Sequence, residues 1–399
     1  MSVNYFFLTS RIKNLNLKDK RVLLRADLNV PVKNGNISDA YRLRAIEPTI
    51  NLLQKHGAKV ILITHLGRPK GTDPQLSTTI IANWFRKKGY VVSVEPNLEK
   101  AKEKSFEEPA TILLLENLRF FPEKDNYDET QRITFAKKLA LLGDYFVQDA
   151  FAALHRHDTS VTLLPVLFDK DKRFIGPLVE KELQALDAIR TNPANPFVLI
   201  IGGGKIASKL PLIEPMLDKV QTILLCPAIV FTFLKYRGKQ IGKSLVDTQT
   251  VPLVSNILQK AKKLGVAIIF PVDYQIAKDN FDGAVSYTDS DIIPDNSIGI
   301  SIGTKTEKLF TQEIMKAKTV FFNGAFGNRN KEETLYGMKT LMEAMAKSKA
   351  FTVIGGGDSV AAAYSFKLEN SINYLSTAGG STLAYISGVE LPGLKPFDA

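Results

Sequence analysis

The sequence contains 399 residues, of which 45% are hydrophobic and 23% are charged, as in an ordinary globular protein. This length exceeds the roughly 300 residues at which a single hydrophobic core stops growing, so it predicts two domains. The one cysteine, Cys226, excludes an intramolecular disulfide and a cysteine-based zinc site, and the formal net charge of +11 is spread along the chain without a basic block.

The charge and hydropathy patterns argue against several classes of protein. Scattered lysines and arginines indicate a generally basic surface first, anionic small substrates second and nucleic acid third, so we expect no nucleic acid partner. The apolar cluster Tyr5–Leu8 is too short for a signal peptide, and no apolar run is long enough to span a bilayer. We expect a cytoplasmic protein with no membrane partner.

Short apolar runs alternate with amphipathic stretches along the whole chain. Such runs are typical of strands buried on both faces of a parallel sheet. The predicted strands are Arg21–Arg25, Lys59–Thr64, Val91–Val94, Thr111–Leu115, Tyr145–Gln148, Phe197–Ile201, Thr222–Leu225, Val266–Phe270, Thr319–Phe322, Phe351–Ile354 and Tyr374–Leu375. Apolar residues at helical spacing predict helices over 42–55, 131–142, 251–264, 305–317 and 332–347. The alternation predicts an α/β fold with helices on both faces of parallel sheets.

A domain boundary is expected between residues 170 and 196. The charged segment Asp169–Arg173 leads to Gly176-Pro177 and to a helix-like stretch from Val179 to Ile189, and Asn192–Pro196 then breaks the chain. The helix is either a hinge element between two α/β units or one more crossover helix, and the sequence is equally compatible with both interpretations.

Basic and polar residues follow the predicted strands of the first half, where ligands of open α/β sheets bind. These segments are Arg25–Pro31, His65–Pro69, Glu116–Phe120 and Asp149–His157. The planar guanidinium group binds phosphate and carboxylate through two parallel hydrogen bonds, so arginines at four strand ends predict an anion site. They are Arg25, Arg68, Arg119 and Arg156. Any one of them alone would more simply be a surface charge.

Glycine-rich turns take the equivalent positions in the second half. They are Gly202–Gly204 and Gly355–Gly357, each opening a predicted helix, and Ala378–Ser381. Such turns expose backbone N–H groups that bind phosphate, although any single one could merely make a tight turn. Lys205 and Lys209 lie one helical turn apart and could serve phosphates together. Asp358 is the candidate ligand for Mg²⁺.

Two standard nucleotide-binding motifs are not met. The segment Gly238–Ser244 is one residue short of a Walker A loop and follows no predicted strand directly. Gly202, Gly204 and Ala207 formally match the Rossmann pattern, but Cys226-Pro227 stands where an acidic residue should end the next strand. A dehydrogenase is therefore the weaker interpretation.

Taken together and in this order, these segments resemble the phosphoglycerate kinase family. The segments are Arg25–Pro31, Tyr41–Ala45, His65–Pro69, Leu115–Phe120, Gly202–Lys209, Gly355–Asp358 and Val389–Gly393. The resemblance is collinear over nearly the whole chain, without a large insertion. It implies two doubly wound parallel-sheet domains joined by a hinge helix. The N-terminal substrate domain would comprise residues 1–177 with the C-terminal tail of about 388–399, and the nucleotide domain residues 178–387, including the hinge helix near 178–191.

The resemblance also implies an activity. It is reversible phosphoryl transfer between 1,3-bisphosphoglycerate and Mg-ADP, giving 3-phosphoglycerate and ATP in glycolysis or gluconeogenesis, by a hinge-bending phosphotransferase with a carboxyl group as acceptor. The cofactor would be Mg²⁺, bound with ATP or ADP, and we expect a monomer.

Roles for individual residues follow from the same resemblance. Phosphoglycerate would be bound by Asp27, Asn29, Arg42, His65, Arg68, Arg119 and Arg156. The transferring phosphoryl group would meet Arg42, Lys205, Gly379 and Gly380. The nucleotide would be bound by Lys205, Lys209, Asn323, Asn330, Gly355, Gly356, Gly357, Asp358 and Ser359, with Asp358 as the metal ligand.

The sequence departs from the family mainly on the nucleotide side. Cys226–Val230 replaces a Gly-Gly-Gly-Met-Ala run beside the adenine, and Asn330 replaces the glutamate that would hold the ribose. Ala378 and Ser208 replace a glycine and an aspartate, and in the first half Ala152–Leu154 replaces Gly-Thr-Ala. We favour an active kinase with a reshaped, less selective nucleotide pocket, because the charged groups needed for transfer are present. The alternative is a related fold with weakened catalysis that acts as a binding or interaction protein.

Overall fold

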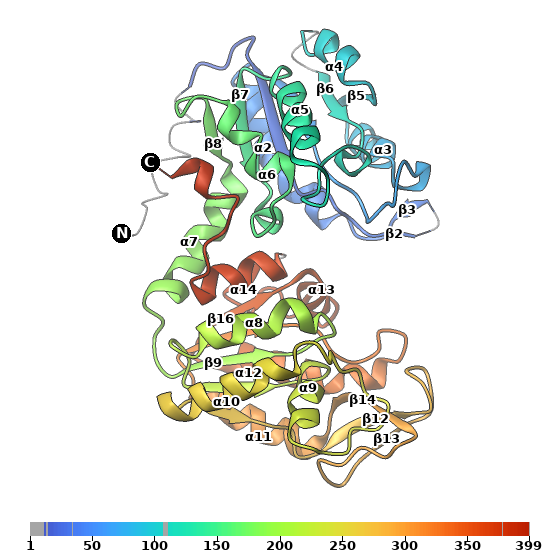
Figure 1. The fold of residues 1–399 in the computed structure, drawn as a ribbon, viewed down its shortest axis with the longest axis vertical. Helices are drawn as coiled ribbons and strands as arrows, with labels where there is room; N and C mark the ends of the chain where they lie inside the picture. The colour runs from blue at the N-terminus through green and yellow to red at the C-terminus, as the bar shows by residue number, and fades with distance from the viewer. Residues whose placement is uncertain (1–11, 13–14, 34, 107–110, 377, 399) are drawn as a thin grey trace. The chain divides into compact units, whose positions relative to one another are not determined.

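The computed structural model describes residues 12, 15–33, 35–106, 111–376 and 378–398. The chain divides into two compact units. Unit 1 comprises Met1–Gln184 together with Glu390–Ala399, and unit 2 comprises Ala185–Val389. Each unit is built around its own parallel sheet (Figure 1).

The sheet of unit 1 has six parallel strands in the order β5-β6-β4-β1-β7-β8. Their bounds are β1 (Arg21–Ala26), β4 (Lys59–Ile63), β5 (Val91–Glu95), β6 (Thr111–Leu115), β7 (Tyr145–Asp149) and β8 (Arg173–Ile175). The central strand β1 is buried from Val22 to Ala26 because helices cover both faces of the sheet. A separate two-stranded hairpin, β2 (Val32–Lys33) with β3 (Asn36–Ile37), follows β1.

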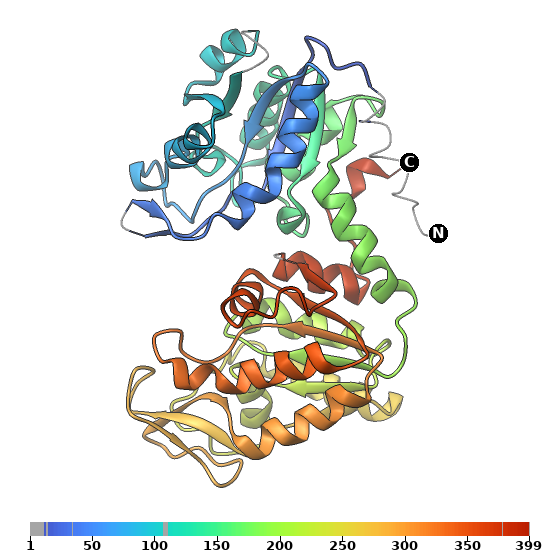
Figure 2. The ribbon, with the colours of Figure 1, turned by 180° about the vertical axis from the view of Figure 1, so that it is seen from behind.

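The helices of unit 1 cover both faces of this sheet. Helix α2 lies in front of the sheet in Figure 2, whereas α5 and α6 lie in front of it in Figure 1, so they pack on opposite faces. The bounds are α2 (Tyr41–Lys55), α3 (Thr79–Lys87), α4 (Leu98–Lys104), α5 (Glu129–Ala140) and α6 (Thr159–Thr162), with short 3₁₀ turns η2 (Pro74–Leu76), η3 (Leu118–Phe120), η4 (Phe151–Ala153) and η5 (Pro165–Leu167).

The sheet of unit 2 repeats this plan with the strand order β11-β10-β9-β15-β16-β17. The strands are β9 (Phe197–Ile201), β10 (Thr222–Leu225), β11 (Ala267–Ile269), β15 (Thr319–Asn323), β16 (Phe351–Gly355) and β17 (Tyr374–Ser376). Helices α8 and α10 lie in front of the sheet in Figure 1, and α11 and α12 lie in front of it in Figure 2. The helices are α8 (Ile206–Met216), α9 (Ile229–Tyr236), α10 (Val251–Leu264), α11 (Thr304–Lys316), α12 (Tyr336–Lys347), α13 (Gly357–Ser365) and α14 (Gly379–Ser387), with the 3₁₀ turn η6 (Glu332–Leu335) before α12.

The sequence did not predict an antiparallel sheet in unit 2. Strand β12 (Tyr274–Lys278) pairs on one side with β13 (Val285–Tyr287) and on the other with β14 (Ser297–Ile302). Both β12 and β13 mix polar and apolar residues, and β13 is only three residues long with its side chains partly or fully exposed. Neither strand therefore carries the continuous apolar run on which the strand prediction relied.

Helix α7 (Pro177–Thr191) crosses the boundary between the two units and begins at a buried carboxylate. Asp149, the last residue of β7, accepts hydrogen bonds from the backbone N–H groups of Leu178 at 2.8 Å and Val179 at 3.1 Å. Its other oxygen accepts a hydrogen bond of 2.6 Å from the hydroxyl of Thr49 in α2. Burial outweighs these bonds and raises the pKa of Asp149 to about 6.

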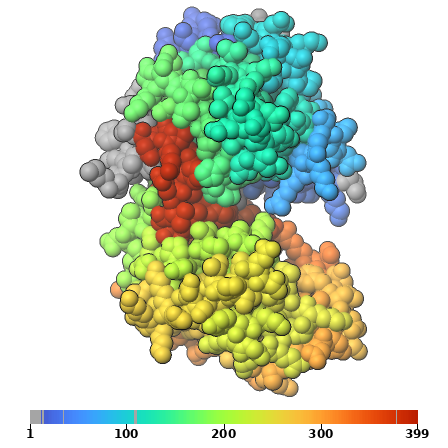
Figure 3. Space-filling model, viewed as in Figure 1, coloured from blue at the N-terminus to red at the C-terminus, as the bar shows by residue number. Residues whose placement is uncertain are grey.

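The segment that follows α14 returns to unit 1. The backbone N–H of Gly393 donates to the carbonyl of Leu154 at 2.9 Å, and Phe397, in η7 (Lys395–Phe397), stacks near Phe146 with ring centroids 6.4 Å apart. Figure 3 shows this segment in red on the surface beside green residues of unit 1. Burial of Leu391, Leu394 and Phe397 anchors it there.

Candidate functional site

The loops after β1, β4, β6 and β7 meet at the C-terminal edge of the unit 1 sheet. Strand β1 leads through α2 to β4 on one side, and β7 leads to β8 on the other, so the strand order changes direction between β1 and β7. Open α/β sheets bind their ligands at such a point. Of the basic residues expected there from the sequence, Arg68, Arg119 and Arg156 lie in the segments after these strands and Arg42 at the start of α2, whereas Arg25 lies in β1 itself.

Arg42 joins the start of α2 to the loop after β1. Its guanidinium lies 2.9 Å from the carboxylate of Asp27 and donates at 3.1 Å to the carbonyl of Asn29. The amide oxygen of Asn29 accepts a hydrogen bond of 2.8 Å from the N–H of Gly67. These contacts couple the β1 loop to the β4 loop and hold Asp27, Asn29 and Arg42 together.

Arg119 lies in η3, directly after β6, and is buried. Its guanidinium donates to the carbonyl of Gly67. Asn117 fixes the same two loops, because its side chain accepts from the N–H of Leu66 at 3.1 Å and donates to the Leu66 carbonyl at 2.7 Å. This role of Asn117 was not predicted from the sequence, although the side chain follows a predicted strand and can both donate and accept.

Arg156, Arg68 and Arg119 bring several positive charges together at this edge. Arg156 pairs with the buried Asp158 at 2.8 Å, whereas Arg68 is exposed. Burial, followed by repulsion from Arg156, lowers the pKa of Arg119 to about 10. A bound anion would relieve this repulsion, so the edge is suited electrostatically to a phosphate or carboxylate ligand.

His65, the second residue after β4, lies among these arginines with only 4% of its surface exposed. Burial, then the charges of Arg25, Arg119, Arg156 and Arg42, hold its pKa well below the usual range. Arg25, which the sequence grouped with the anion-binding arginines, is fully buried. Its nitrogens contact Ser160, the Ala26 carbonyl and His65. Arg25 is therefore part of the internal hydrogen-bond network and is corrected here from a ligand to a support of the site.

The turns after β9 and β15 are packed together in unit 2. Gly324 has φ +115°, and a Cβ there would lie 2.0 Å from the carbonyl oxygen of Gly202 and 2.2 Å from the Nζ of Lys209. Lys209 donates to the Gly202 carbonyl at 2.7 Å, and burial lowers its pKa to about 8. The glycines thus have a packing role, and the Lys209 ammonium lies at the junction of these two turns.

The turns after β16 and β17 are joined to the others by side chains. The buried Asn323 donates through its amide to the carbonyls of Gly355 at 3.2 Å and Gly379 at 3.3 Å. The hydroxyl of Ser359 accepts from the N–H of Gly324 at 3.1 Å. A Cβ on Gly379 would lie 3.0 Å from the Cα of Gly356, which has φ +105°. The glycine turns therefore form one assembly at the C-terminal edge of the unit 2 sheet.

Several residues at this edge are exposed. They are Lys205, Gly357, Asp358, Asn330 and Gly380. The carboxylate of Asp358, in the first turn of α13, lies 2.9 Å from the guanidinium of Arg329, which also donates to the Asp358 carbonyl at 3.2 Å. Arg329 was not predicted from the sequence as a site residue. Its charge beside a carboxylate can be found only from the fold.

The structure shows the surroundings of the residues that depart from the family pattern on the nucleotide side. Cys226 is fully buried, packs against Gly202, and has a pKa raised by that burial, so it is a structural thiol rather than a reactive one. The Pro227 carbonyl accepts from the N–H of Gly203 at 2.8 Å. Asn330 is exposed, and its backbone N–H donates to the Asn328 side chain at 2.9 Å.

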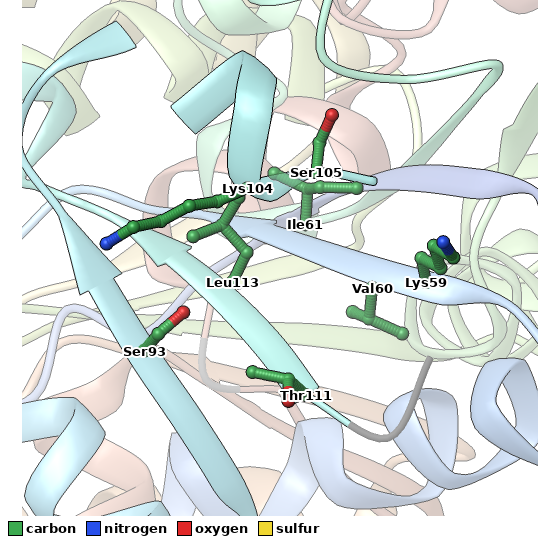
Figure 4. Close-up of a pocket in the computed structure, with 8 residues that line it drawn as sticks. All are labelled: Lys59, Val60, Ile61, Ser93, Lys104, Ser105, Thr111 and Leu113. Atoms are coloured by element: carbon green, nitrogen blue, oxygen red, sulfur yellow. The ribbon is translucent and has the colours of Figure 1, made fainter. Parts of the chain in front are cut away.

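Two hollows of unit 1 lie apart from the arginine cluster. Figure 4 shows Lys59, Ser93 and Thr111 around a space of about 10 Å³, the size of one water molecule. Among the described residues the Ser93 hydroxyl has no hydrogen-bond partner, so a water fits there and a metabolite does not. A mainly apolar groove of about 590 Å³ is lined by residues that fall between Pro96 and Lys138 in the sequence. Lys138 already pairs with Glu99 at 3.6 Å, so this groove does not suit a polyanion.

Known proteins resemble this chain over nearly its whole length. A family model described as phosphoglycerate kinase matches residues 12–389. A phosphoglycerate kinase of Finegoldia magna is 38% identical over 396 residues, covering 97% of this chain and 98% of the relative. One of Borrelia hermsii is 39% identical over 391 residues, covering 96% and 98%.

Solved structures of phosphoglycerate kinases share the fold of this chain. The phosphoglycerate kinase of Coxiella burnetii superposes with a TM-score of 0.77 at 34% identity, and that of Pyrococcus horikoshii with 0.82 at 27%. Each alignment covers 96% of this chain and 97% of the other. The α/β fold with doubly wound parallel sheets predicted from the sequence is confirmed. Within the part of the chain that the structure describes, no helix is both long and apolar enough to cross a bilayer.

Proposed function

The chain belongs to the phosphoglycerate kinase family and catalyses reversible phosphoryl transfer between 1,3-bisphosphoglycerate and ADP, giving 3-phosphoglycerate and ATP; we propose that its two sheet edges bind the two substrates. The edge of unit 1 binds the phosphoglycerate, and the edge of unit 2 binds the nucleotide. None of the comparisons supports the alternative of a binding protein with weakened catalysis.

The observation that carries this proposal is the convergence of cationic side chains on His65. The phosphate of the glycerate is bound by His65, Arg68, Arg119 and Arg156. Arg42 reaches the carboxyl end and the phosphoryl group in transfer, and Asp27 and Asn29 bond the hydroxyl. Support comes from the lowered pKa of Arg119, which burial and then repulsion from Arg156 cause, since a dianionic ligand offsets the repulsion.

The residues present suit a carboxyl group as phosphoryl acceptor. A carboxylate is ionised at neutral pH, so it attacks without a general base, and catalysis reduces to alignment and charge neutralisation. Asp27, whose carboxylate is paired with Arg42, is not arranged as a base. Lys205 and the N–H groups of Gly379 and Gly380 neutralise the group in transfer.

The glycine turns of unit 2 bind the nucleotide phosphates through backbone N–H groups at the starts of α8, α13 and α14. The residues are Lys205, Lys209, Asn323, Gly355, Gly356, Gly357, Asp358 and Ser359, and Asn330 lies on the ribose side. Mg²⁺ takes one or two carboxylates together with substrate phosphates, and the exposed carboxylate of Asp358 beside a glycine turn fits this requirement. When bound, the metal neutralises phosphate charge. We further propose a cytoplasmic monomer.

The two edges can be tested separately by calorimetry. Arg68 is exposed, so Arg68→Ala leaves the fold intact. We expect it to weaken binding of 3-phosphoglycerate about tenfold or more, by removing one charged hydrogen-bonding group, while leaving the affinity for Mg-ADP unchanged. Lys205→Ala is the matched variant of the other edge, and we expect it to lower kcat while 3-phosphoglycerate still binds. If either variant lost affinity for 3-phosphoglycerate and for Mg-ADP to the same extent, the assignment of one substrate to each sheet edge would be wrong.

A further inference from the structure

Beneath the arginine cluster lies a buried chain of four side chains, Glu123, Ser160, Arg25 and His65. Each has at most 4% of its surface exposed. The hydroxyl of Ser160 donates to one oxygen of Glu123, and the backbone N–H of Ser160 donates to the other at 3.0 Å. Arg25 donates from Nε to the Ser160 hydroxyl at 2.8 Å, and its Nη2 lies 3.1 Å from Nδ1 of His65.

The contact between Arg25 and His65 determines where the imidazole proton lies. A guanidinium has only donors and stays protonated, so Nδ1 of His65 must be the acceptor in this hydrogen bond. The single proton of the neutral ring is then on Nε2. A second proton on Nδ1 would set two donors against each other beside a positive charge. His65 is therefore held as a neutral group whose other nitrogen is a hydrogen-bond donor.

Arg25 cannot turn away from His65, because every side of its guanidinium is engaged. Nε is bonded to Ser160, and Nη1 donates to the carbonyl of Ala26. Arg25 lies in the central strand β1, paired in register with Ile63 of β4 and Gln148 of β7. Glu123 and Asp158 supply negative charge opposite the fully buried guanidinium; burial raises the pKa of Glu123 to about 7, while the charge of Arg25 opposes that rise.

We propose that Arg25, Ser160 and Glu123 are positioning residues that fix His65 as the neutral Nε2–H tautomer, so that it offers phosphoglycerate an uncharged donor among arginines. The inference rests on the proposed role of His65 in substrate binding. Four arginines already act on His65, and a charged imidazolium would add repulsion there. A neutral donor adds a directed hydrogen bond without that cost, and its strength does not change as pH crosses the usual histidine pKa of about 6.5.

The tautomer can be measured directly by long-range ¹H–¹⁵N NMR of the full chain with ¹⁵N-labelled histidine. The chain has only four histidines, and His65→Gln assigns the signal. In the unsubstituted protein we expect an unprotonated Nδ1 and a protonated Nε2 without ligand, unchanged from about pH 5.5 to 8. A proton on Nδ1, or titration of His65 in that range, would overturn the proposal without the need for any variant.

Two substitutions of Arg25 separate positioning from mere structural support. Arg25→Gln can both donate and accept, so we expect mixed tautomers and a KM for 3-phosphoglycerate raised about threefold to tenfold, with the affinity for Mg-ADP unchanged. Arg25→Lys keeps a cation that only donates, and we expect it to retain the Nε2–H tautomer even where the protein is less stable. Ser160→Ala breaks the link to Glu123, and we expect its tautomer populations and its KM for 3-phosphoglycerate to lie between those of the two Arg25 variants.

The outcomes distinguish this inference from the proposed function. Retention of the tautomer in Arg25→Gln would refute positioning by Arg25, whatever happens to activity. A tautomer shift in Arg25→Gln without any change in 3-phosphoglycerate binding would refute the benefit to substrate that we infer. If the unsubstituted protein bound no 3-phosphoglycerate while His65 showed the expected tautomer, the proposed function of the edge would fail and the assignment of the proton would stand.

Discussion

Replacing Gly324 by alanine should test whether the glycine turns of unit 2 form one close-packed assembly. With φ +115°, an L-residue at this position is strained by about 1–2 kcal/mol. The added Cβ also lies 2.0 Å from the Gly202 carbonyl oxygen, and that oxygen is held by a hydrogen bond from Lys209. Displacing packed backbone costs about a further 1–3 kcal/mol. We therefore expect Gly324→Ala to lower the free energy of unfolding by about 3 kcal/mol.

The matched control is Gly238→Ala, also in unit 2. Gly238 has φ +70°, but a Cβ there would meet nothing within 4 Å, so only the strain of about 1 kcal/mol applies. For a unit of about 200 residues, scanning calorimetry should show Tm lowered by about 6–12 °C in the Gly324 variant and by about 2–4 °C in the control. Equal shifts in the two variants would refute the packing argument. The Gly324 variant should also bind Mg-ADP more weakly while its affinity for 3-phosphoglycerate is unchanged.

Three further predictions concern metal binding, pH and the base. Arg329→Ala frees the carboxylate of Asp358 from an exposed ion pair of at most about 1 kcal/mol, so the ratio of ADP affinities with and without Mg²⁺ should rise up to about fivefold in calorimetry, and an unchanged ratio would contradict this. Because burial raises the pKa of Asp149 to about 6 from 3.8, the folded protein binds this proton more tightly than the unfolded chain. The stability of unit 1 should then fall as pH rises from about 4 to about 6; fluorescence of Trp84, the single tryptophan, reports this in urea, and Asp149→Asn should reduce the fall but leave the part due to Glu123, whose pKa burial raises to about 7. Finally, the altered residues near Cys226 predict little discrimination between ADP and GDP, which a strong adenine preference in calorimetry would disprove.

The sequence predicted the parallel sheets closely because their strands are continuous apolar runs. Every predicted strand coincides with a strand of the structure, and no end differs by more than one residue. Such runs are buried on both faces, so hydrophobicity alone marks them. Strand β8 was not predicted, because its first residue, Arg173, ends the charged segment and only two apolar residues follow. The strands β12, β13 and β14 were not predicted either, since polar residues or glycine interrupt their apolar runs.

The candidate site was predictable to the level of which residues follow which strands, and no further. An arginine at the end of a predicted strand gives the same sequence pattern in two different situations. It can be exposed to a ligand, like Arg68, or fully buried, like Arg25. The difference lies in Ser160 and Glu123, which are 135 and 98 positions further along the chain than Arg25 and reach it only through the fold. Likewise, the pairing of Arg329 with Asp358 joins segments that no local pattern connects.

The division of unit 1 into two stretches of sequence has a consequence for synthesis on the ribosome. Residues 390–399 belong to unit 1, yet they are translated only after the whole of unit 2. Until then Phe146 lacks the ring of Phe397, and the Leu154 carbonyl lacks the N–H of Gly393. Domains generally fold as they emerge, at about 5–20 residues per second. Here the second unit can finish first, and the apolar surface that the returning segment covers stays exposed for the seconds in between.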